Sequence, residues 1–242
     1  MLDEMPVLRD AAQGYRAAAT AAGVAWPQRA DMQGAHPPDL VYRLFDVDHI
    51  PEQLSWLESQ GWDSSMLFPD GGDLQPWPTD ETAGESLNML SVSVGTPFHW
   101  RHQIPIFRFS TMVYTFVLEG DHEGEIWRYL ISPDAWDPVR AAPSLAALLI
   151  QWTMGIAAGV VYYSEPHRCL IVGDRTVPMT FNELWQRAPH LDPAAFPNDL
   201  PGPLLRQRQR ECGVDLDCID RGFESWEELT DAVDAVRASL GL

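Results

Sequence analysis

The sequence contains no lysine: its 16 basic residues are all arginine, against 35 acidic residues, and the formal net charge over 242 residues is −19. A surface this negative repels phosphate backbones, so direct nucleic-acid binding would require a local cationic stripe. The densest arginine group, Arg206, Arg208 and Arg210, has a spacing of two and would face different sides of a helix, which favours a solvated surface. We expect no direct nucleic-acid binding. The charge favours a basic protein partner, with solubility as the simpler alternative.

Cysteine is scarce as well. Cys169, Cys212 and Cys218 are an odd number without the spacing of a disulfide framework, which indicates a reducing compartment. Residues 1–6 begin acidic and lack the basic end and apolar run of a signal peptide. From these features we expect a cytoplasmic protein.

One uncharged stretch, residues 141–164, is long enough to cross a membrane. Its apolar residues fall on one side of a helix, from Leu145 to Ile156, and residues 160–163 then follow as a β-branched and aromatic run. We therefore expect a buried helix followed by a strand, and no membrane association.

Motifs for catalysis or metal binding are absent. His99 and His102 form one histidine pair without a second pair to complete a zinc site, and the acidic residues at 215, 217 and 220 lack the glycine and closing glutamate of a calcium loop. The sequence has no Gly-x-Ser-x-Gly elbow and no phosphate-binding glycine loop in a favourable charge setting. We predict no catalytic residue, no metal site and no cofactor.

The pattern of apolar residues predicts an α+β fold. Strands are expected at 90–94, 104–109, 112–118 and 125–131, with residues 119–124 as a hairpin turn, so that the sheet is mostly an antiparallel meander flanked by helices. Helices are expected at 3–22, from about 51 to 61 and from Ser144, and a further hairpin at 160–163 with 169–172. Two capping boxes, Thr180 with Glu183 and Ser225 with Glu228, predict helices in a C-terminal helical extension. We expect a single domain over residues 1–242.

One tract stands out as a candidate surface. No basic residue lies between Arg43 and Arg101, whereas acidic residues recur throughout and alternate with aromatic ones. Carboxylates that orient a cationic partner and aromatics that supply contact area are typical of a protein interface. The alternative is a solvated acidic loop whose tryptophans belong to the core. The predicted partner-binding residues are Asp46, Asp48, Glu58, Trp62, Asp63, Asp70, Asp73 and Trp77.

The middle of the chain resembles the SMI1/KNR4 family, also called the SUKH superfamily. The resemblance is carried by Trp100 with the Ile-Pro-Ile of 104–106, the apolar strand at 115–118, the Gly-Glu-Ile-Trp of 124–127, and the run from 139 to 149. It covers residues 98–153 well and 38–97 loosely. Leu145 replaces the usual aromatic at the helix start, the loop at 109–112 is shortened, and nothing in 180–242 matches.

The resemblance implies a family-like core at about 38–155 and an extension at about 156–242. It also implies a binding function, because many bacterial members are immunity proteins that neutralise a toxin, frequently a nuclease, whereas fungal members are regulatory interaction proteins. Our first hypothesis is thus an immunity protein that holds a basic toxin domain through an acidic surface. The alternatives are a hydrolase-like enzyme assembled from scattered residues such as His99, His102 and Glu119, and a regulatory scaffold without a toxin partner. The partner's identity and the oligomeric state stay open.

Overall fold

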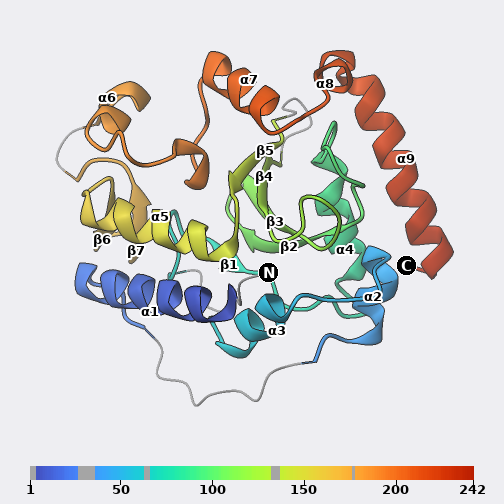
Figure 1. Ribbon diagram of the computed structural model, residues 1–242, viewed down its shortest axis with the longest axis horizontal. Helices are drawn as coiled ribbons and strands as arrows, with labels where there is room; N and C mark the ends of the chain where they lie inside the picture. Colours follow the sequence, from blue (N-terminus) through green and yellow to red (C-terminus); the bar gives the residue numbers. More distant parts are fainter. Residues whose placement is uncertain (1–3, 27–35, 63–65, 132–136, 176–177) are drawn as a thin grey trace.

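Five strands pair in chain order as an antiparallel meander, which confirms the predicted α+β architecture (Figure 1). The computed structural model describes residues 4–26, 36–62, 66–131, 137–175 and 178–242. A separate antiparallel hairpin is formed by β6 and β7, as the sequence predicts. The strands are β1 (Asp73–Leu74), β2 (Gln103–Arg108), β3 (Met112–Val117), β4 (Ile126–Leu130), β5 (Val139–Ala142), β6 (Val161–Ser164) and β7 (Cys169–Val172).

Helices surround the five-stranded sheet (Figure 1). Their bounds are α1 (Glu4–Ala22), α2 (Asp39–Phe45), α3 (Glu52–Ser59), α4 (Ala83–Asn88), α5 (Leu145–Ala157), α6 (Phe181–Gln186), α7 (Gly202–Glu211), α8 (Leu216–Arg221) and α9 (Phe223–Leu240), with short 3-10 helices η1 (Met89–Val92) and η2 (Pro193–Ala195). None of the described helices is long and apolar enough to cross a membrane.

The sheet is buried on both of its faces. Because side chains alternate along a strand, Tyr114 and Phe116 of β3 point to one face, and Val113 and Val117 point to the other. The first face packs against α1 and α5 in the larger apolar cluster. The second face packs against η1 and the segment leading into α8 in a smaller cluster. All six residues of β3 are consequently buried.

The helix α5 begins where the sequence predicts. The Oγ of Ser144 accepts a hydrogen bond from the backbone N–H of Ala147 at 3.1 Å, which satisfies one of the free amides of the first turn. Its apolar side lies along α1, and Trp152 is fully buried between the two helices and the sheet. The Nε1 of Trp152 donates to the carbonyl of Ala195 at 2.7 Å, so the helix also holds η2.

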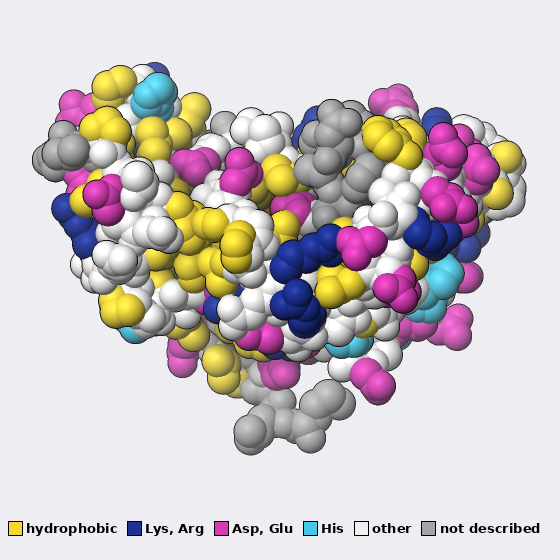
Figure 2. All heavy atoms as spheres, turned by 90° about the horizontal axis from the view of Figure 1, so that it is seen from above, with side chains coloured by type: hydrophobic (Ala, Val, Ile, Leu, Met, Phe, Trp, Pro, Cys, Tyr) yellow, Lys and Arg dark blue, Asp and Glu magenta, His cyan; other side chains and the backbone are white. Residues whose placement is uncertain are grey.

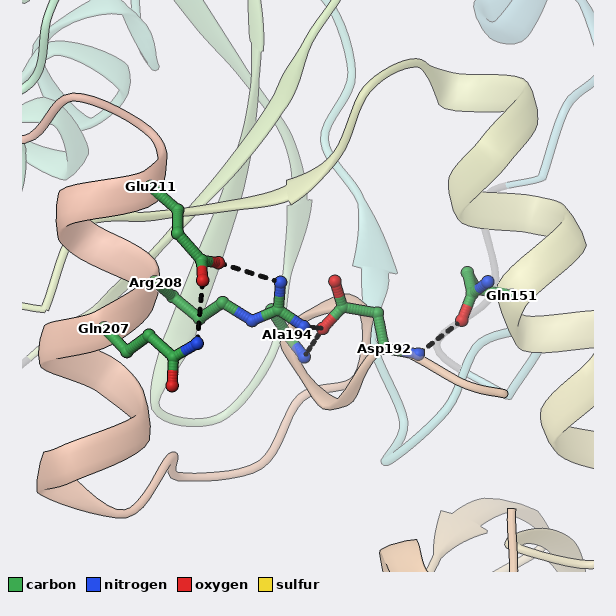
Figure 3. Close-up of polar contacts among 6 residues, drawn as sticks. All are labelled: Gln151, Asp192, Ala194, Gln207, Arg208 and Glu211. Atoms are coloured by element: carbon green, nitrogen blue, oxygen red, sulfur yellow. Dashed lines mark hydrogen bonds and ion pairs between the residues drawn. The ribbon is translucent and has the colours of Figure 1, made fainter. Parts of the chain in front are cut away.

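The C-terminal extension is attached to the sheet by polar contacts. Arg128 of β4 is fully buried, and its Nη1 donates to the carbonyls of Phe196 at 2.7 Å and Asn198 at 2.8 Å. Asp192 forms a second link: its N–H donates to Gln151 of α5, and its carboxylate receives Arg208 of α7 at 3.1 Å (Figure 3). The extension is therefore tied to α5 and to the sheet.

Two sequence predictions are wrong. Residues 90–94 are not a strand: Leu87 and Leu90 are buried at helical spacing, and the Oγ atoms of Ser91 and Ser93 bond to carbonyls three residues earlier in the 3-10 turn. The second capping box is absent because the N-cap of α9 lies three positions earlier, at Gly222, whose φ of 61° only glycine adopts readily. Strands β1 and β5 were not expected.

The contact between α5 and the extension makes a testable prediction at Gly155. A Cβ at this position would lie 2.6 Å from a ring carbon of Phe196, which is fully buried. Alanine favours a helix over glycine by up to about 1 kcal/mol, but overpacking costs about 1–3 kcal/mol. We expect Gly155→Ala to lower the free energy of unfolding by about 1–2 kcal/mol in urea denaturation.

Gly14→Ala is the matched control, since a Cβ at Gly14 of α1 meets no atom within 4 Å. This substitution should raise stability by about 0.5–1 kcal/mol. If both substitutions stabilise the protein equally, the packing described here is incorrect.

Candidate partner-binding site

The eight predicted partner-binding residues do not form one surface. Asp46 and Asp48 are exposed just after α2. The Nη1 of Arg101, two residues before β2, lies 3.5 Å from the Oδ2 of Asp46, while Arg101 Nε donates to the carbonyl of Leu44 at 2.8 Å. These contacts place Asp46 at the start of β2.

Asp73, another of the predicted residues, lies at the opposite end of β2. Asp73 of β1 is paired with Arg108, the last residue of that strand. A strand advances about 3.3 Å per residue, so Asp73 and Asp46 are separated by roughly 20 Å. Glu58 and Trp77 are half-buried and line one small cavity with residues 104–106 of β2. The tract from 44 to 100 is therefore spread along the length of the strand.

Two further members of the set face inward, and one is outside the described residues. Trp62 is 3% exposed and packs edge-on against Trp26 and Trp56, so it belongs to the core rather than to an interface. Asp70 accepts a hydrogen bond from the backbone N–H of Val172 in β7 at 3.0 Å. Asp63 lies outside the described residues.

The structure instead gathers acidic residues from four separate segments at the start of β2. We call this region the acidic end. Glu4 opens α1, Glu52 opens α3, and the β3–β4 turn adds acidic residues of its own. Glu119 of the turn pairs with His102, and the neighbouring Arg101 contacts Asp46, so the turn lies near the end of α2. The acidic end comprises Glu4, Asp46, Asp48, Glu52, Glu119, Asp121 and Glu123.

Glycines give the β3–β4 turn its shape. Gly120 and Gly124 have φ values of 85° and 87°, in the region that glycine adopts without strain. The N–H of Gly124 donates to the carbonyl of Val117 at 2.9 Å, and the N–H of Glu123 donates to that of Gly120 at 3.2 Å. The turn is closed by these bonds, and Asp121 and Glu123 are left exposed.

A groove opens beside this turn. It consists of two neighbouring cavities, of about 490 and 240 Å³, that share Glu4, Gln53, Phe116 and Gly124 in their walls. Glu4, Glu52 and Glu123 line the larger cavity, and none of the described arginines lines either one. The smaller cavity is walled by apolar residues of α1 and α5, namely Val7, Leu8, Leu145 and Ala146.

The residues of the enzyme hypothesis do converge at the acidic end. His102 Nδ1 lies 2.8 Å from Glu119 Oε1, and the rings of His99 and His102 are 4.7 Å apart. Partial burial, with the neighbouring His102 and Arg101, lowers the pKa of His99 below its usual value. The His102 and Glu119 side chains are 24% and 44% exposed, and the 360 Å³ cavity near α8 and α9 is lined by His99 without them.

No metal site accompanies these residues. Within the described ranges, no three His, Cys, Asp or Glu side chains are grouped so that they could hold a metal ion. The arrangement supports charge-based recognition of a cation more readily than hydrolysis, because its carboxylates are spread along an open groove and are mostly exposed.

The arginines of α7 are largely neutralised. Arg206 pairs with Asp220, and Arg208 pairs with Asp192 and Glu211 (Figure 3). From above, arginine side chains lie at the centre, at the right and at the left edge of the face, with acidic side chains interspersed (Figure 2). This face is therefore mixed in charge.

No protein-family model matches this chain, and no curated protein matches it. The residues of the SMI1/KNR4 resemblance lie in β2, β3, β4 and β5 and at the start of α5. They belong to the meander and its covering helix.

The environment of Asp70 makes a prediction about pH. Burial raises its pKa from 3.8 to about 6, against the smaller opposing effect of the hydrogen bond from Val172. The folded state then binds this proton more tightly than the unfolded state does. The resulting stabilisation is fully present below pH 3.8 and is lost as the pH rises through about 6.

Asparagine keeps the acceptor for Val172 and removes the ionisation. We expect Asp70→Asn to raise the free energy of unfolding by about 1–2 kcal/mol at pH 8 and to change it by less than about 0.5 kcal/mol at pH 4. Urea denaturation at the two pH values measures this, with exposed Asp10→Asn on α1 as control. An effect of equal size at both values would contradict the assigned burial.

Proposed function

We infer that this chain is a protein-binding module whose acidic end holds a basic protein. The observation that carries the inference is the acidic groove: acidic residues of α1, α3 and the β3–β4 turn line one cavity, an apolar cavity adjoins it, and no arginine in the described part of the chain lines either. An interface needs this combination, because charge steers the encounter and desolvated apolar contact slows dissociation.

Two arginines near the acidic end, Arg101 and Arg140, already have partners within the chain. Arg101 is turned toward the backbone, where it donates to carbonyls of Arg43 and Leu44, and its side chain is only 14% exposed. Arg140 is paired with Glu125 at 2.7 Å, below the turn. Both cations therefore have partners of their own, and Asp48, Glu52 and Glu123 form no ion pair with another described residue.

The partner class follows from the resemblance to immunity proteins. A nuclease toxin is basic where it grips phosphates, so an acidic inhibitor can occupy that region by presenting similar charge. We accordingly propose neutralisation of a basic toxin domain in the cytoplasm as the biological role. The α+β meander is compatible with this family-based assignment.

The test uses the basic protein that this chain, as bait, pulls down from a lysate of its native host. The measured quantity is the rate at which the two proteins associate. The triple variant Asp48→Asn, Glu52→Gln, Glu123→Gln should associate about tenfold more slowly at low salt, with a weaker salt dependence, because steering by local charge is reduced. Stopped-flow fluorescence measures the rate. In the host, wild-type chain should relieve growth arrest by that protein, and the variant should do so less well.

The matched control removes the same charge elsewhere, with Glu224→Gln, Glu227→Gln and Asp231→Asn on the exposed side of α9. Its association rate should stay within about twofold of wild type. If the two triple variants slow association equally, only net charge matters and the assignment to the acidic end is wrong.

A further inference from the structure

The groove at the acidic end is divided into two parts with different chemistry. The larger part is lined by Glu4, Glu52 and Glu123 with His49. The smaller part is lined by Val7, Leu8, Leu145 and Ala146. Phe116 and Gly124 belong to both, so the two parts are adjoining chambers of one groove.

The acidic chamber selects against anions and favours a cationic side chain. Arginine fits better than lysine, because its planar guanidinium can bond to two carboxylates at once and is more weakly hydrated. The chamber volume of about 490 Å³ exceeds that of one side chain, which leaves room for the backbone that carries it.

The apolar chamber calls for a different side chain. Its volume of about 240 Å³ suits one aliphatic side chain. Val7 stands at its rim with 55% of its surface exposed, although its surroundings are strongly charged. Covering this surface is favourable, at about 25 cal/mol per Å².

We propose that the groove binds an extended segment of the partner in which an aliphatic residue and an arginine stand two positions apart. In an extended chain such residues point to the same side, about 6.6 Å apart, so one segment presents both side chains to adjoining chambers that share Phe116 and Gly124. The proposal rests on the proposed function, since the basic partner supplies the arginine. It adds the sequence feature that the groove recognises.

The probe is a set of blocked pentapeptides titrated into the isotope-labelled full chain by NMR. Gly-Leu-Gly-Arg-Gly is compared with peptides in which the leucine or the arginine is replaced by glycine. We expect the two-residue peptide to bind about tenfold more tightly than either single-residue peptide. The amide shifts should be largest at Gln53, Glu123 and Gly124.

Variants separate the two chambers. Val7→Ser should weaken the two-residue peptide by about three- to fivefold and leave the arginine-only peptide unchanged. Ile150→Ser, on an exposed apolar residue of α5 outside the groove, is its control. Glu52→Gln with Glu123→Gln should weaken both arginine peptides about tenfold, whereas Glu224→Gln with Glu227→Gln should not.

Equal binding of the three peptides, or displacement of the two-residue peptide by an equal concentration of spermidine, would overturn the proposal. Suppose that either result is found while the triple variant at Asp48, Glu52 and Glu123 still associates with the partner more slowly than wild type does. The proposed function then stands, and only the recognised sequence feature is wrong. If partner association ignores the acidic end, the function itself fails, whatever the peptides do.

Discussion

Burial of the meander on both faces is the constraint from which the rest of the structure follows. The side chains of β3 alternate between two apolar clusters, one under α1 and α5 and the other under η1 and the C-terminal extension. A strand covered on both faces reads as a continuous apolar run, as residues 112–117 do. The faces of the sheet are thus occupied, and a binding surface must form at the strand ends and on the covering helices.

The acidic end is one such strand-end surface. It lies where β2 begins and β3 ends, and helices α1 and α3 bring their N-terminal turns to the same place. Glu4 and Glu52 each stand in the first turn of a helix, where a carboxylate interacts favourably with the helix dipole. The same two residues line the groove. The carboxylates that stabilise the helix N-termini therefore also contribute to the negative potential of the groove.

The sequence predicted the parts of the fold that depend on local chemistry. The antiparallel hairpins, the Ser144 start of α5 and the capping box at Thr180 all follow from neighbouring residues, and the structure confirms them. The strand predicted at residues 90–94 was wrong because a short apolar run fits a strand and a 3-10 turn equally well until its packing is known. The capping box at Ser225 was wrong because Gly222, with a φ of 61°, both ends α8 and serves as the N-cap residue of α9.

The candidate site was predictable only in part, for a related reason. Asp46 and Asp48 were identified from the tract without arginine between Arg43 and Arg101. That tract is spread along β2 in the folded chain, and its Trp62 is buried in the core. Glu4 and Glu123 are 119 positions apart and meet only through the packing of α1 against the sheet. The available signal was the acidic composition of residues 119–125, which the sequence explains equally well as a turn.

Hydrogen–deuterium exchange of the chain alone and in complex with its basic partner locates the contact without altering any residue. If the partner binds at the acidic end, exchange should slow at the first turn of α3 and in residues 119–124, with α9 and the α6–α8 side unchanged. Protection confined to α9 or to the α6–α8 side, with the acidic end exchanging as in the free chain, would show that the partner binds elsewhere.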